Sequence, residues 1–168
     1  MKIAFGLIAG ASLLSVACIR EPERPLYTEY RPVLLSRESL EKSITLQSPA
    51  KIKSPAKIYF KDNFIFISEQ FKGVHIIDNA DPKNPVNKGY IGVPGCVDMA
   101  IKDDVLYVDN ATDLVAVDLS SLSSNQISVS KRIKNAFPEL STPDGRMVPD
   151  KYSLESRPKN TVLVEWIK

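Results

Sequence analysis

The chain repeats one pattern of apolar runs and turns at an interval of about 40 residues. Residues 61–68 read KDNFIFIS and align with residues 102–109, KDDVLYVD, at an offset of 41 (102 − 61). Residues 74–78, VHIID, align with residues 114–118, LVAVD, at an offset of 40 (114 − 74). Short β-branched and aromatic runs at this interval are typical of four-stranded propeller blades. The repeat therefore predicts an all-β fold of propeller-like antiparallel blades.

Each repeat unit contains four runs that predict strands. They lie at residues 57–60, 64–68, 74–78 and 89–93 in the first unit, and at 97–101, 105–109, 114–119 and 126–133 in the second. The second run of each unit is almost wholly apolar, whereas a half-exposed strand alternates. Neighbouring blades should therefore cover both faces of these strands. Phe66 and Tyr107 hold the same place in the two units, and we expect equivalent core positions there.

The repeat weakens after residue 133 and returns at residues 161–167, which resemble residues 113–119 with about seven residues inserted. At 41 residues per blade, residues 57–168 make about 2.7 blades, whereas closed propellers use four or more. We therefore expect residues 56–168 to form an incomplete ring. The strand at 161–167 would have nothing after it, and the first blade would have nothing before it. Open sheet edges and uncovered faces predict self-association or a partner subunit.

The first 17 residues have the pattern of a secretory signal peptide. Lys2 precedes an apolar run, and the small residues 15–17 stand directly before Cys18. The apolar run is too short to remain as a membrane-spanning helix. The segment resembles a bacterial lipoprotein signal, although Ser15 stands where such signals usually have Leu. This resemblance implies cleavage before Cys18 and attachment of lipid, with acyl chains such as palmitate, to its sulfur.

Lipidation of Cys18 predicts a protein anchored in the bacterial cell envelope, at the outer membrane, with its periplasmic or surface face left open. An ordinary secreted protein with an incidental cysteine is the alternative. If Cys18 is lipidated, Cys96 is the only free thiol, so no intramolecular disulfide can form. A lone cysteine in a β context predicts a small buried apolar group.

Residues 18–55 are expected to form a tether, because closely spaced prolines disfavour regular strands. Within the tether, Ser36 provides an N-cap, and Leu40 and Ile44 are spaced i, i+4. This pattern predicts a short helix resting on the domain. The prolines of this segment are Pro22, Pro25, Pro32, Pro49 and Pro55.

The loop between the third and fourth strands of the first unit contains several side chains with oxygen atoms that could bind calcium. The segment has no glycine and no glutamate at the spacing of a calcium hand. Two prolines and several side chains that form Asx turns favour a rigid loop instead. We therefore expect no metal and no cofactor. The oxygen ligands considered are Asp78, Asn79, Asp81 and Asn84.

Four carboxylates at strand ends are the best candidates for acid and base catalysis. Capping and solvation are a sufficient structural reason for their positions. His75 is the only histidine and occupies the repeat position of Val115, so it is expected to fill an apolar slot. The sequence therefore predicts no catalytic residues and no enzyme. The four carboxylates are Asp78, Asp109, Asp118 and Glu165.

Residues 73–86 and 113–120 resemble the LVIVD repeat, in which a Leu-Val-Ile-Val-Asp-like strand precedes a polar turn. Residues 91–95 and 135–138 are further matching stretches. The resemblance implies a β-propeller fold and a place among uncharacterised LVIVD-repeat lipoproteins of bacterial envelopes. It brings no catalytic residues. Longer members of the family continue past the length of this chain, which suggests a short or truncated member.

These features predict a noncatalytic binding or scaffold module with a protein or glycan partner. The alternatives are a truncated fragment without an independent function and a glycan-active or hydrolytic enzyme. The net charge of +2 is spread along the 168 residues, so no basic stripe indicates a nucleic-acid partner.

Overall fold

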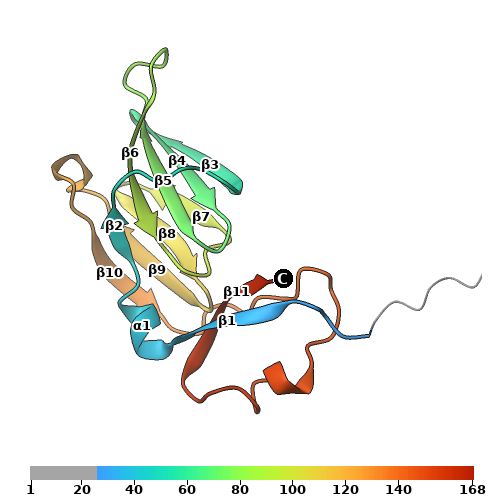
Figure 1. The fold of residues 1–168 in the computed structure, drawn as a ribbon. Helices are drawn as coiled ribbons and strands as arrows, with labels where there is room; N and C mark the ends of the chain where they lie inside the picture. Colours follow the sequence, from blue (N-terminus) through green and yellow to red (C-terminus); the bar gives the residue numbers. More distant parts are fainter. Residues whose placement is uncertain (1–25) are drawn as a thin grey trace, which may run out of the picture.

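The computed structural model describes residues 26–168, and the predicted signal peptide and Cys18 lie outside the described residues. The described chain is all β, as predicted, and forms three antiparallel sheets (Figure 1). None of the three sheets is closed. Within residues 26–168, no helix is long and apolar enough to cross a membrane.

The first repeat unit forms a five-stranded sheet in the order β2-β6-β5-β4-β3. The four strands predicted from the repeat are present, and β2 adds a fifth strand against β6. Asp62 has a φ of 51° in the β3–β4 turn, a left-handed conformation that Asp tolerates. The strands are β2 (Thr45–Gln47), β3 (Pro55–Lys61), β4 (Phe64–Glu69), β5 (Gly73–Asp78) and β6 (Val86–Gly92).

The second repeat unit forms a four-stranded sheet in the order β10-β9-β8-β7. Asp103 has a φ of 52° in the β7–β8 turn, so this turn repeats the geometry of the β3–β4 turn 41 residues earlier. A 3-10 helix, η1 (Leu122–Ser124), connects the last two strands. The strands are β7 (Met99–Lys102), β8 (Val105–Asn110), β9 (Asp113–Asp118) and β10 (Ser128–Ile133).

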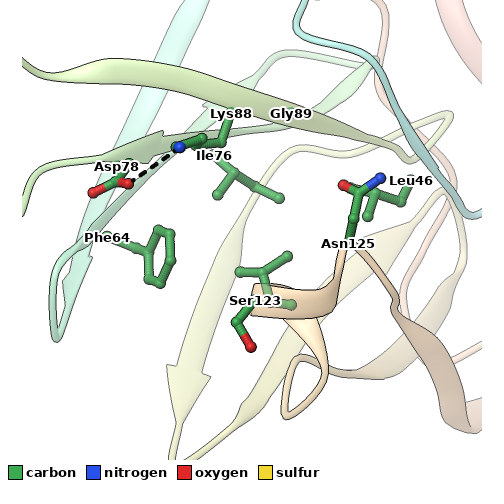
Figure 2. Close-up of a pocket in the computed structure, with 9 residues that line it drawn as sticks. Leu46, Phe64, Ile76, Asp78, Lys88, Gly89, Ser123 and Asn125 are labelled. Carbon is green, nitrogen blue, oxygen red and sulfur yellow. Dashed lines mark ion pairs between the residues drawn. The ribbon is translucent and has the colours of Figure 1, made fainter.

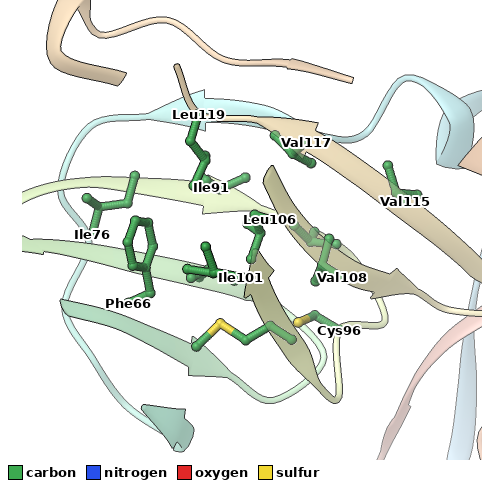
Figure 3. Packing of buried hydrophobic residues seen from close by; sticks show 13 residues of the cluster. Phe66, Ile76, Ile91, Cys96, Ile101, Leu106, Val108, Val115, Val117 and Leu119 are labelled. Carbon is green, nitrogen blue, oxygen red and sulfur yellow. The ribbon is translucent and has the colours of Figure 1, made fainter. Parts of the chain in front are cut away.

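The main core lies where these two sheets face each other (Figure 3). Phe66 and Ile76 from the first sheet and Leu106 from the second are each at most 1% exposed. Burial of an aliphatic or aromatic side chain stabilises a fold by roughly 1.5–3 kcal/mol, so this interface holds the two repeat units together. The other buried members are Val74, Ile91, Val93, Cys96, Met99, Ile101, Val108, Val115, Val117 and Leu119.

The expectation that Phe66 and Tyr107 are equivalent core positions is wrong. Phe66 is 1% exposed in the core, whereas Tyr107 is 38% exposed. On β8 the neighbours of Tyr107, Leu106 and Val108, are the buried side chains. Phe66 therefore packs in the core between the two sheets, whereas Tyr107 lies on the face of the second sheet that is turned away from this core. The repeat position predicts on which face of its strand a side chain lies. It does not predict whether another sheet covers that face.

The third sheet pairs β1 (Arg31–Ser36) with β11 (Thr161–Ile167). The expectation that residues 18–55 form a tether without regular strands is therefore wrong for β1 and β2. Pro32 is tolerated because β1 lies in a two-stranded sheet, where one strand edge needs no hydrogen bonds from it. The sequence predicts an open sheet edge at residues 161–167. In the structure β1 pairs with one edge of β11, a partner that the repeat did not indicate.

The predicted short helix is present as α1 (Arg37–Glu41). The Ser36 side chain accepts a hydrogen bond from the backbone N–H of Ser39 at 3.1 Å, as an N-cap should. Leu40 is fully buried in a second, smaller apolar cluster with Val162 and Val164 of β11. The helix therefore fixes the third sheet to the rest of the molecule.

A buried ionic network joins α1 to the second sheet around Asp113, which is fully buried. Arg37 donates to both Asp113 carboxylate oxygens at 2.8 and 2.7 Å, and Arg132 donates at 2.9 Å. Burial would raise the pKa of the Asp113 carboxyl, but hydrogen bonds from Arg37, the Asn135 N–H and Arg132 hold this pKa below its ordinary value. Asp113 is therefore a charged structural centre.

Candidate functional site

Two of the hollows in the described chain have volumes and linings typical of small-ligand sites. The first, the inter-sheet pocket, has a volume of about 330 Å³ and lies at one end of the core (Figure 2). Its polar character comes mainly from an ion pair between Asp78 and Lys88 at 3.6 Å. The lining residues are Leu46, Phe64, Ile76, Asp78, Lys88, Gly89, Leu122, Ser123 and Asn125.

The second hollow, the aromatic cleft, has a volume of about 550 Å³. It lies between the β4–β5 turn of the first sheet and β11 of the third, and charged, hydroxyl and aromatic side chains converge in it. Ligand sites combine an apolar surface with a few placed polar groups in this way. The lining residues are Tyr30, Lys53, Ser54, Glu69, Gln70, Phe71, Lys72, Ser141, Pro143, Glu165 and Trp166.

Glu69 brings a buried carboxylate to the wall of the aromatic cleft. Its Oε2 lies 2.6 Å from Nε2 of His75, which is fully buried beside the Tyr90 ring at 4.7 Å. His75 is buried as the sequence predicted, but it orients a carboxylate instead of only filling an apolar slot. Burial, followed by the nearby charge of Glu69, raises the pKa of Tyr90 well above its usual range.

Phe71 reaches the cleft from a strained backbone position in the β4–β5 turn. Its φ is +63°, a left-handed conformation that bulky residues rarely adopt. Two hydrogen bonds hold the turn: the Phe71 N–H donates to the Cys96 carbonyl at 2.6 Å, and the Gly95 N–H donates to the Phe71 carbonyl at 2.9 Å. The loop before β7 therefore fixes the aromatic residue at the cleft.

The opposite wall is fixed by β11 and the segment before it. Lys72 of the first sheet pairs with Glu165 of β11 at 2.5 Å, and this ion pair joins the two walls of the cleft. The indole Nε1–H of Trp166 donates to the Leu140 carbonyl at 3.0 Å, which sets the orientation of the ring. The cleft therefore exists because the third sheet packs beside the first.

The four candidate catalytic carboxylates lie in separate local environments. Asp78 lines the inter-sheet pocket, and Glu165 lines the aromatic cleft. Asp109 accepts the backbone N–H groups of Val97 and Asp98 at 2.9 and 2.8 Å, and burial raises its pKa. Asp118 accepts the Ser120 N–H at 2.8 Å. Each of the four has a structural partner, and Asp78 and Glu165 line different hollows.

The β5–β6 loop, which begins at Asp78 and contains Asp81, has the geometry of a rigid turn. Asp78 accepts the Ala80 N–H at 3.0 Å, and Asp81 accepts the Lys83 N–H at 3.0 Å and the Asn84 side-chain amide at 2.8 Å. The hydrogen bonds from Asn84 and Lys83 lower the pKa of Asp81. Among residues 26–168, no three His, Cys, Asp or Glu side chains are grouped to hold a metal ion.

Cys96 is fully buried in the main core, as the sequence predicted. Burial, followed by the charges of Asp109 and Asp98, raises the pKa of its thiol far above the ordinary value. A thiol that stays protonated is a poor nucleophile and a poor metal ligand. Cys96 therefore acts as a packing residue.

Sequence reasoning missed the aromatic cleft, although the repeat contains one signal for it. At the offset of 41, Glu69 aligns with Asn110, whose side chain bonds the Pro94 carbonyl and Arg132 inside the second sheet. Glu69 has no arginine of this kind and lines the cleft instead. A difference in residue type between equivalent repeat positions, here Glu69 and Asn110, indicates a position where the two units have different roles.

Comparison of the chain with protein-family models, with curated proteins and with solved structures found no match. The resemblance to LVIVD-repeat lipoproteins therefore stays a prediction.

Proposed function

We propose that this chain is a lipid-anchored protein of the bacterial cell envelope that binds a protein or a glycan without catalysing a reaction. The observation that carries the proposal is the aromatic cleft, where side chains from two sheets converge on a hollow of about 550 Å³. The pattern of residues 1–18 supports the anchor, and on that pattern the protein belongs at the outer membrane.

The two larger sheets are, in this proposal, successive blades of an incomplete LVIVD-type propeller. Their support is the shared strand order and the matching φ values of the Asp62 and Asp103 turns. The opposite exposures of Phe66 and Tyr107 support it further, because repeated blades turn equivalent residues in one rotational sense. The β1–β11 pair takes the place of a third, partial blade.

A hydrolytic activity on glycans is the second candidate function. The observation in its favour is that Glu69 and Glu165 line the same cleft, and paired carboxylates are what glycoside hydrolysis uses. Both carboxylates are held by neighbours, Glu69 by His75 and Glu165 by Lys72, which fits binding better than catalysis. Release of new reducing ends from an oligosaccharide incubated with the protein would favour hydrolysis over simple binding.

Replacing the cysteine that would carry the lipid tests the anchor. We expect Cys18→Ser to move the protein from the membrane fraction to the soluble fraction, because acyl chains on Cys18 are what hold it there. Cys96→Ser is the matched control and should stay with the membranes. Fractionation and intact mass measure both effects. A wild-type protein that is soluble and carries no added mass would contradict the proposal.

Self-association is expected of the protein once it is released from the membrane. Ile58 and Phe60 on the edge strand β3 are 58% and 69% exposed, and exposed apolar edges recruit partners. Light scattering of the soluble Cys18→Ser protein should show species larger than a monomer, and Phe60→Lys should shift it toward monomer. A Cys18→Ser protein that is a monodisperse monomer without the Phe60→Lys change would contradict the expected self-association.

A further inference from the structure

The aromatic cleft carries more information about its ligand than its size alone. Its lining holds two ammonium groups, Lys53 and Lys72, and two carboxylates, Glu69 and Glu165, so their formal charges balance. A balanced site has no strong attraction for a ligand of high net charge. The cleft is therefore suited to a neutral ligand.

The polar groups of the cleft include both hydrogen-bond donors and hydrogen-bond acceptors. The ammonium groups donate and the carboxylates accept, while Ser54, Gln70 and Ser141 can do both. A hydroxyl group also donates and accepts, and its hydrogen bonds to charged partners are among the stronger ones in proteins. A ligand rich in hydroxyl groups can satisfy this lining more completely than a ligand of amides or alkyl chains.

Three rings, Tyr30, Phe71 and Trp166, line the same cleft. Aromatic rings provide rigid apolar surface with little loss of conformational freedom, and such surface suits the C–H faces of a sugar ring. Tyr30 and Phe71 are partly exposed and offer this surface, whereas Trp166 is 5% exposed and lies at the wall behind them. Together, neutral charge, mixed donors and acceptors, and ring faces match the chemistry of a saccharide.

The cleft is also organised before any ligand enters. Glu69 is oriented by His75, Glu165 is paired with Lys72, and Phe71 is held at a φ of +63° by two backbone hydrogen bonds. Strained residues concentrate at ligand sites, and a preorganised site loses less entropy on binding. Nδ1 of His75 is buried and has no hydrogen-bond partner among the described residues.

We propose that the aromatic cleft binds a short neutral oligosaccharide, with Glu69 accepting hydrogen bonds from its hydroxyl groups. This inference rests on the proposed binding function and names the class of its ligand. The alternative occupant, an extended peptide, has backbone amides that would leave the charged groups of the cleft with weaker partners.

Trp166 makes the test direct, because it is the only tryptophan of the chain and lines the cleft. The full chain in mild detergent is titrated with maltotriose, cellotriose and tri-N-acetylchitotriose, with trialanine as the peptide probe. We expect a saturable change in Trp166 emission with at least one trisaccharide and none with trialanine. Isothermal titration calorimetry should give the same midpoint for that sugar.

Glu69→Gln should weaken the binding of that sugar roughly ten- to a hundredfold, since it replaces a charged acceptor with a neutral one. Tyr30 is half-buried, and Tyr30→Ala should also weaken the binding of that sugar. This variant tests the cleft independently if Glu69→Gln fails to fold. Asp78→Asn in the inter-sheet pocket is the control and should bind as the wild type does.

The proposal is overturned if no trisaccharide gives a signal by either method, or if trialanine binds as tightly as the sugars. It is equally overturned if every folded variant of Glu69 and Tyr30 binds like the wild type. Membrane fractionation of the Cys18→Ser variant is a separate measurement, so a cleft that binds no sugar leaves the anchor intact. A cleft that binds sugar in a protein without lipid would contradict only the anchor.

Discussion

Phe66→Ala should lower the free energy of unfolding by about 3–5 kcal/mol, the usual cost of deleting a buried phenylalanine. Phe66 is 1% exposed and fills the interface between the two larger sheets, so its removal leaves a cavity where the repeat units meet. Urea denaturation followed by far-ultraviolet circular dichroism, which reports all three sheets, measures the change. A domain of ordinary stability would be close to unfolding after such a loss.

Tyr107→Ala is the matched control, because Tyr107 holds the equivalent repeat position and is 38% exposed. Its cost should be about 1 kcal/mol or less, as for other partly exposed side chains without a special role. Equal losses for the two variants would show that the outer face of the second sheet is covered in solution. A Phe66→Ala protein as stable as the wild type would contradict the packing of the two sheets.

Asp113→Ala should cost a similar amount, about 3–5 kcal/mol, because it leaves Arg37 and Arg132 without their buried partner. The Asp113 pKa is lowered in the folded state, so its contribution is present above the pKa of the unfolded chain. That contribution is lost as the pH falls through the folded-state pKa. Urea denaturation at several pH values below 5 should show that the free energy of unfolding of the wild type falls as the pH is lowered. The same decrease should be much smaller in the variant.

Asp118→Ala is the control for this experiment, since Asp118 lies on the same strand and accepts the backbone N–H of Ser120. The loss of such a hydrogen bond costs about 1 kcal/mol. If Asp113→Ala lowered the free energy of unfolding no more than Asp118→Ala does, the ionic network around Asp113 would not stabilise the fold. The third sheet would then depend on apolar packing alone.

The repeat was sufficient to predict the two larger sheets because their information is local. Each strand of a unit pairs with the strand next to it in sequence, and Asp62 and Asp103 specify the tightest of the connecting turns. The all-β class, the strands of both units and the α1 N-cap at Ser36 could therefore be predicted from spacing and turn chemistry.

The third sheet could not be predicted in this way, because its partners are far apart in sequence. Arg31 pairs with Ile167, which is 136 residues later (167 − 31), and no local pattern relates the two strands. The prolines of residues 18–55 were a misleading signal, since an edge strand tolerates Pro32 where a central strand would not. The aromatic cleft depends on this sheet and was missed for the same reason.

The pairing of β1 with β11 also sets an order of events during folding. In the two larger sheets, β3 to β6 and β7 to β10 each pair with the strand next to them in sequence, so these strands can pair soon after their own residues have been synthesised. β1 must wait for β11, which is made about 130 residues later, and closing so long a loop is slow. The cleft that we assign to a saccharide is therefore the last part of the molecule to assemble, and local opening of β1 can remove it without melting the core.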